Sequence, residues 1–134
     1  MTTVSTRPCL VLTSRRGDDP TLSAWLAESL RQAGIEAQRV EDVIIPGAVG
    51  PSIRQAIQRA PVIVVDITDK DPEVMYYVGL AHAWRKPVYF VAQRDLKRIP
   101  QALAGEFVYT YELGNPEDLA SQVSSLTERI RQWL

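Results

Sequence analysis

Residues that bind metals or form disulfides are scarce in this sequence. It has one cysteine, Cys9, and one histidine, His82. A lone cysteine cannot form an internal disulfide, and one cysteine with one histidine is too few for the usual metal site of nitrogen and sulfur ligands. We therefore expect neither a disulfide nor a bound metal.

Long apolar segments and an excess of one charge are also absent. No run reaches the roughly 18 apolar residues of a membrane span, and the opening MTTVSTRP has no apolar stretch of signal-peptide length. The 15 Lys and Arg residues nearly balance the 16 Asp and Glu residues, for a net charge of −1. No basic field exists to attract nucleic acid or a membrane surface. We expect a cytoplasmic protein that binds neither.

The motifs of several common enzyme classes are missing. The sequence contains no GxGxxG dinucleotide fingerprint, no GxxxxGK[ST] phosphate loop and no GxSxG nucleophile turn. A phosphoacceptor receiver would need a lysine after its fifth strand, where this chain reads YELGN. No cofactor is therefore expected.

What is present is an ordinary globular composition. The chain has 134 residues, of which 46% are hydrophobic and 23% are charged. This length and composition predict a single domain over residues 1–134 with a sizeable core.

Strand-like and helix-like segments alternate along the chain. Short apolar runs predict strands at 8–13, 35–40, 61–67, 86–92 and 107–111. Helical spacing and capping residues predict helices after Asp19-Pro20, at 51–60, from Asp71-Pro72 to about 84, and after Asn115-Pro116. The alternation predicts a flavodoxin-like or Rossmann-like α/β three-layer sandwich. Its five-stranded parallel sheet would have the order 2-1-3-4-5, with helices on both faces.

The last helix carries an apolar stripe formed by Leu119, Val123, Leu126, Ile130 and Leu134. This stripe predicts a helix that covers the sheet. Trp133 near its end fits either that core or a contact between two copies of the chain.

Ligands of open parallel sheets bind at the carboxyl ends of the strands. The residues expected there are Thr13, Ser14, Arg15, Asp66, Thr68, Asp69 and Gln93. Carboxylates accept hydrogen bonds from ribose hydroxyls, whereas hydroxyls, arginine and free helix N–H groups bind phosphate. Polar residues also begin ordinary loops, and Asp71 is explained equally well as a helix cap.

Two residues in the helix after Asp71 are unusual for a helix interior. Gly79 costs about 1 kcal/mol there, which predicts a close approach of the backbone to the sheet or to a ligand. His82 follows one turn later. A packed or capping histidine is the ordinary interpretation, and a catalytic base is the alternative.

The longest recognisable motif spans residues 60–93, which read APVIVVDITDKDPEVMYYVGLAHAWRKPVYFVAQ. This stretch resembles the nucleoside 2-deoxyribosyltransferase-like superfamily, especially its TIR-like nucleotide-binding branch. That branch reads D-[LI]-T-x-x-N-P-N-V-x-Y-E-[LI]-G-x-A-H-A-x-x-K-P-V after an apolar strand. The matching positions are Asp66, Ile67, Thr68, Pro72, Val74, Tyr76, Gly79, Ala81, His82, Ala83, Lys86, Pro87 and Val88.

The departures from this motif bear on catalysis. Catalytic members of the superfamily use the Glu of Y-E-x-G as a nucleophile, and Tyr77 occupies that position here. A phenol with a pKa near 10 is a poor substitute at neutral pH. Asp71 and Glu73 replace the two Asn residues of N-P-N. The resemblance therefore implies that the usual glycosyl transfer is lost or weakened.

A rearranged active site is the alternative. Glu73 lies four residues before Tyr77, so both side chains point along one helix face. Either residue is thus a candidate catalytic group. Tyr76 and Tyr77 are also candidates to stack on a base or sugar.

The resemblance predicts a nucleotide-binding or nucleoside-binding module without the usual glycosyl transfer, acting in bacterial signalling or defence. It also implies a homo-oligomer, because relatives build sites at subunit contacts. The alternatives are an active N-glycosidase or 2-deoxyribosyltransferase that uses Glu73, and a protein–protein interaction module that has abandoned the pocket.

Overall fold

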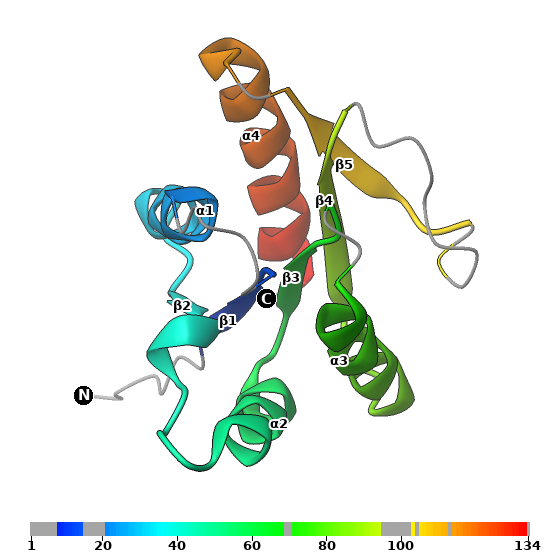
Figure 1. The fold of residues 1–134 in the computed structure, drawn as a ribbon. Coiled ribbons are helices and arrows are strands. Elements are labelled where there is room, and N and C mark those ends of the chain that lie inside the picture. Colours follow the sequence, from blue (N-terminus) through cyan, green and yellow to red (C-terminus); the bar gives the residue numbers. More distant parts are fainter. Residues whose placement is uncertain are drawn as a thin grey trace.

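The apolar runs of the sequence form five short strands, and an α-helix separates consecutive strands except β4 and β5, between which none is described (Figure 1). The computed structural model describes residues 8–14, 21–68, 71–94, 103, 105–112 and 114–133. The strands are β1 (Cys9–Leu12), β2 (Ala37–Arg39), β3 (Ile63–Asp66), β4 (Val88–Gln93) and β5 (Val108–Tyr111). The helices are α1 (Thr21–Gln32), α2 (Val49–Arg59), α3 (Pro72–Ala83) and α4 (Pro116–Trp133), with a short 3-10 turn η1 (Val40–Asp42) after β2.

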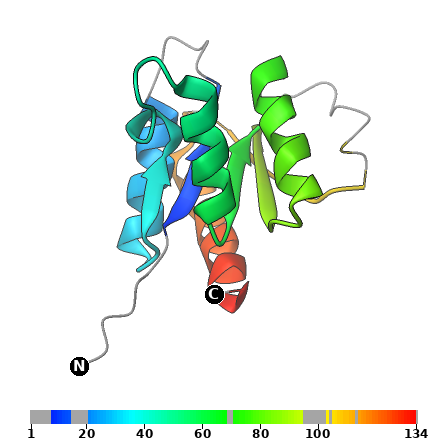
Figure 2. The same ribbon diagram turned by 90° about the horizontal axis from the view of Figure 1, so that it is seen from below.

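All five strands are parallel and lie in the order β2-β1-β3-β4-β5. Helices α2 and α3 cover one face of the sheet, and α1 and α4 cover the other (Figure 2). The predicted fold class, strand order and three-layer arrangement are confirmed. Parallel neighbours need a crossover connection, which is usually a helix, and the crossover helices account for the covering of both faces.

The core is divided into two layers by the sheet. Alternate residues of a strand point to opposite faces, so Leu10 packs toward α2 and α3 whereas Val11 packs toward α1 and α4. The same alternation places Val65 on the first face and Val64 on the second. Strands buried on both faces read as continuous apolar runs, which is why the sequence identified them.

Helix ends follow the capping residues. The Asp71 carboxylate accepts a hydrogen bond from the Glu73 backbone N–H at 2.9 Å, and Pro72 occupies the first position of α3. Asn115 caps α4 in the same way through the Asp118 backbone N–H at 3.1 Å. Helix α2 begins at Val49 rather than at the predicted Pro51, because a proline is tolerated in a first turn, where its missing N–H has no partner.

Three sequence predictions lie wholly or partly beyond this description. Asp19 and Pro20, expected to begin α1, are outside the described residues, as is Leu134 of the α4 stripe. The loop or short helix expected after β4 is described only in part. Within the description, Leu126 and Ile130 of α4 are buried, as the stripe predicts, but Trp133 is 61% exposed and does not belong to the core.

We predict that Cys9 is inert to thiol reagents in the folded protein. Its side chain is 1% exposed in a central strand, and burial raises the pKa of the thiol to about 12. The reactive thiolate is therefore nearly absent at pH 8. We expect negligible labelling by Ellman's reagent in buffer and one thiol per chain in denaturant. Complete labelling within seconds in buffer would contradict this burial.

Candidate functional site

The parallel topology gathers most of the predicted ligand-binding residues at the carboxyl ends of the strands, termed here the carboxyl edge. Thr13 and Ser14 follow β1, Asp66 ends β3, Thr68 comes two residues later, and Gln93 ends β4. This placement follows from the parallel pairing of β1, β3 and β4. Two further predicted residues, Arg15 and Asp69, lie outside the described residues.

Asp66 is held in a hydrogen-bond network that joins three strands. The Tyr111 hydroxyl donates to Asp66 Oδ2 at 2.6 Å, and the Thr68 backbone N–H donates to Asp66 Oδ1 at 2.8 Å. The Gln93 backbone N–H donates to Thr68 Oγ1 at 2.9 Å. Asp66 is 6% exposed. The carboxylate predicted to meet ribose hydroxyls therefore already binds β5 and its own loop.

Tyr111 has an altered acidity because of this position. Burial of its ring and hydroxyl, followed by the charge of Asp66 and the hydrogen bond to it, raises the pKa of Tyr111 well above its ordinary value. The hydroxyl stays protonated and keeps donating to the carboxylate throughout the physiological pH range. The sequence indicated Tyr111 only as the end of a strand.

Ser14 and Asp71 connect β1 with the start of α3. The Ser14 hydroxyl donates to Asp71 Oδ2 at 2.8 Å, while Asp71 Oδ1 caps the helix. Asp71 is buried. The capping interpretation of Asp71 is confirmed, and the role of Ser14 as a ligand-binding residue stays a prediction.

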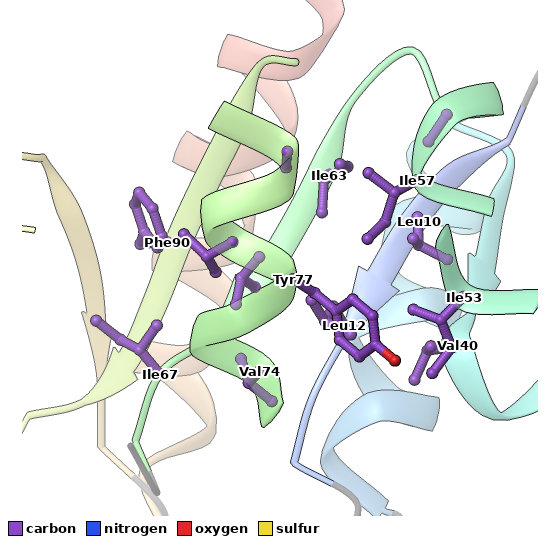
Figure 3. Close-up of a cluster of buried hydrophobic side chains, with 14 of the residues drawn as sticks. Leu10, Leu12, Val40, Ile53, Ile57, Ile63, Ile67, Val74, Tyr77 and Phe90 are labelled. Atoms are coloured by element: carbon purple, nitrogen blue, oxygen red, sulfur yellow. The ribbon is translucent and has the colours of Figure 1, made fainter. Parts of the chain in front are cut away.

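Glu73 and Tyr77 line one small cavity, as their spacing along a single helix face predicts. The other lining residues come mainly from β1, the residue after it, and α2, and include Leu12, Thr13 and Ile53. The cavity holds about 10 Å³, room for a single water molecule. The Tyr77 side chain is 4% exposed and lies between Leu12 and Ile53 (Figure 3), whereas Glu73 is exposed.

The remaining predicted residues of α3 lie on its outer surface. Tyr76 is 53% exposed, and its ring meets the edge of Tyr77. His82 is exposed and its ring contacts Phe90 edge-on, at 6.0 Å between centroids. Gly79 is exposed, and a Cβ added there would touch nothing within 4 Å. The predicted close approach of Gly79 to the sheet is therefore wrong, because this residue faces away from the strands.

Sequence reasoning missed one carboxylate near the carboxyl edge. Glu41 lies in η1, directly after β2, and accepts a hydrogen bond from the Ser23 hydroxyl at 2.7 Å. Its other oxygen, Oε1, is buried and has no hydrogen-bond partner in the described part of the chain. The rule that selected Asp66, a polar residue at the end of a strand, would also have selected Glu41.

A separate hollow lies between α1 and α4, on the opposite face of the sheet from α3. This α1–α4 groove has a volume of about 690 Å³. Trp25, Leu119 and Val123 provide its apolar lining, and Ala120 and Ser124 are exposed within it. It is an open surface feature formed by two long helices.

Charges of both signs flank the α1–α4 groove. Glu128 and Arg131 of α4 line the groove and pair with each other at 3.8 Å. The Glu28–Arg31 pair of α1, at 3.6 Å, is not part of the lining, and Arg31 donates to the Ala37 carbonyl oxygen of β2. Arg131 also donates a hydrogen bond to the Ala33 carbonyl oxygen, which connects α4 to the end of α1. An exposed pair of this kind contributes little to stability, so the Glu128 carboxylate can exchange this contact for one with a partner.

Two further classes of feature are not found in the described ranges. No helix there is long and apolar enough to cross a membrane. No group of three or more His, Cys, Asp or Glu side chains in those ranges could hold a metal ion.

Comparison with known proteins shows the fold of this chain. No family model matches the sequence, and no curated protein matches it. Among solved structures, it is similar to the RPS4 and RRS1 TIR domain heterodimer, with a TM-score of 0.65 and 18% sequence identity. The match covers 94% of this chain and 97% of that chain. The chain therefore has a TIR-like fold, and the resemblance to 2-deoxyribosyltransferases stays a prediction.

We predict that the Tyr111→Phe substitution lowers the free energy of unfolding by about 1–3 kcal/mol, because it removes the hydroxyl that donates to buried Asp66. The folded-state pKa of Tyr111 lies above the unfolded value of about 10. Its contribution is therefore complete below about pH 10 and declines at higher pH. Urea denaturation at several pH values measures both effects.

Tyr109→Phe is the matched control for this substitution. Tyr109 is a buried tyrosine of the same strand, and its hydroxyl has no hydrogen bond to a described residue. We expect its removal to change stability by less than about 0.5 kcal/mol. Equal losses of unfolding free energy in the two variants would mean that the hydrogen bond to Asp66 does not contribute to stability.

Proposed function

We propose that this chain is a TIR-like interaction module that pairs with a second domain of the same fold through the α1–α4 groove. The observation that carries the proposal is the groove itself, whose lining is apolar and whose rim holds Glu128 and Arg131, one charge of each sign. Interfaces between proteins have this anatomy, with an apolar centre and a polar edge. The similar TIR domains form a heterodimer, which supports association as the mode of action.

The rim of the groove favours a partner of the same kind. Helix α4 contributes one acid and one base to this rim, Glu128 and Arg131. Two copies related by a two-fold axis can therefore place each acid opposite a base of the other copy. Such pairing steers association without requiring a net charge on either partner.

The polar residues of the carboxyl edge already have partners within the chain, which is a second argument for association rather than catalysis. Asp66 and Asp71 are buried and already hydrogen-bonded within the chain. Tyr77, at the position of the superfamily nucleophile, is packed among apolar side chains. The contacts of Asp66, Asp71 and Tyr77 within the chain stabilise the carboxyl edge without a ligand.

We predict that Ala120→Glu abolishes this association. Ala120 is exposed within the groove, so a carboxylate there would have to be buried without a partner when the groove is covered. We expect the dissociation constant measured by sedimentation velocity to rise at least about tenfold.

Ser121→Glu is the matched control for Ala120→Glu. Ser121 is the next residue of α4 and is exposed outside the groove, so the variant adds the same charge to the same helix. It should associate like the parent chain. If both variants associate as tightly as the parent, the α1–α4 groove is not the interface.

A second candidate function is nucleoside or nucleotide binding at the carboxyl edge without glycosyl transfer. The observation that favours it is that Glu73 and Tyr76 are both exposed on the first turns of α3, where Glu73 also lies beside Thr13. The cavity between Thr13 and Tyr77 has room for only one water molecule, so a ligand would lie on this surface. A carboxylate and a hydroxyl suit sugar hydroxyls, and a tyrosine face suits a base. In the enzyme alternative, exposed Glu73 would be the nucleophile.

We predict that a panel of nucleosides, deoxynucleotides and NAD contains a ligand whose affinity falls at least about tenfold in Glu73→Gln. Binding is measured by calorimetry, and free base is measured by chromatography. Glu117→Gln, another exposed first-turn acid, is the control and should bind normally. We expect no base release.

The alternatives give different results in the same experiment. Base release that Glu73→Gln abolishes would establish the enzyme alternative. Absence of binding to every compound at millimolar concentration would contradict ligand recognition, and association would be the remaining function.

A further inference from the structure

A second groove runs along the outer side of α2, on the opposite face of the sheet from the α1–α4 groove. This α2 groove has a volume of about 390 Å³. Ile45, Pro51 and Trp84 supply its apolar lining, and Arg54, Gln55 and Gln58 supply its polar lining. Ile45 is 60% exposed, so this apolar surface is open to solvent.

The charge of the α2 groove has one sign. Arg54 lines it, and none of the described lining residues is an acid. Exposed Arg59 and Arg85 directly follow lining residues Gln58 and Trp84 in the sequence. None of the three arginines has an ion pair within the described residues, so the groove suits an apolar group accompanied by a carboxylate.

Within the described residues, the chain itself offers a surface segment of that chemistry. Four large hydrophobic side chains are exposed in the described part, namely Ile45, Tyr76, Phe107 and Trp133. Ile45 belongs to the groove. Trp133 lies close in the sequence to Arg129 and Arg131, which would repel the arginines of the groove. The residues on either side of Tyr76, Met75 and Tyr77, carry no acidic group.

Phe107 is the candidate that remains, and the residues around it combine an exposed apolar ring with an acidic group. It is 68% exposed, directly follows exposed Glu106, and directly precedes β5. The edge of its ring packs on Tyr109 with centroids 4.8 Å apart, which holds the ring in place before any contact forms. An already ordered side chain loses less entropy on binding.

Phe107 cannot reach the α2 groove of its own chain. Helix α3 lies between α2 and the segment that leads into β5 (Figure 2). If the Phe107 segment occupies this groove, it must therefore come from another copy. We propose that the α2 groove receives the Glu106–Phe107 segment of a second copy, with Glu106 facing Arg54.

This contact joins two different surfaces, so it is heterologous. Each copy retains a free groove at one end and a free Phe107 segment at the other, and association continues into a ring or a filament. The surfaces are distinct from the α1–α4 groove, and the proposal does not depend on the proposed function.

The sharpest test reverses the two charges in separate chains. Arg54→Glu alone would place a new carboxylate against Glu106, and Glu106→Arg alone would place two cations together. Each variant should associate at least about tenfold more weakly than the parent in sedimentation velocity. An equimolar mixture should recover parental affinity, because the intact groove of one variant meets the intact Glu106 of the other.

Phe107→Ala and Tyr76→Ala form the matched pair for the apolar part of the contact. Both remove an exposed aromatic ring, but only the first should weaken association, by at least about tenfold. Circular dichroism confirms that each variant is folded. Repeating the series in the Ala120→Glu chain removes any association through the α1–α4 groove.

Three results would overturn the proposal. The first is a parent chain that stays monomeric at every concentration tested. The second is a mixture of charge variants that associates no better than either variant alone. The third is equal behaviour of Phe107→Ala and Tyr76→Ala. Loss of association with Ala120→Glu alone would instead support the α1–α4 groove, so the two proposals fail separately.

Discussion

Burial of the parallel sheet on both faces is the constraint on which the rest of this structure depends. Helices cover each face, so strand residues such as Leu10, Val11, Val64 and Val65 are nearly all apolar. Polar chemistry is therefore confined to strand ends, loops and the outer surfaces of helices. The carboxyl edge lies at the strand ends, and the two grooves lie on the outer surfaces of the helices.

At the carboxyl edge, the cost of burying polar groups determines what the residues do. Asp66 ends a buried strand, and a carboxylate in that position needs donors. Tyr111 and the Thr68 backbone supply them, and the resulting network joins β3 to β5. Residues that resemble a ligand-binding motif thus also hold the end of the sheet together.

The groove surfaces connect the fold with association. Helices α1 and α4 pack side by side on one face of the sheet, and α2 and α3 on the other. Each pair leaves a hollow with exposed side chains at its margin. The two hollows differ in charge, since Glu128 and Arg131 line the α1–α4 groove whereas Arg54 is the charged residue that lines the α2 groove. A balanced rim suits a two-fold pair, and a cationic groove requires an acidic partner surface.

The sequence by itself determined the elements and their order, because the signals are local. Apolar runs, helical spacing and caps such as Asp71 and Asn115 act over a few residues, and alternation of strands and helices leaves few topologies. Tertiary structure alone decided how Gly79, Trp133 and Tyr111 are used. Gly79 faces solvent, Trp133 stays outside the core, and Tyr111 meets Asp66 across 45 residues. Such outcomes depend on which surfaces come together in space, and a local pattern does not contain that information.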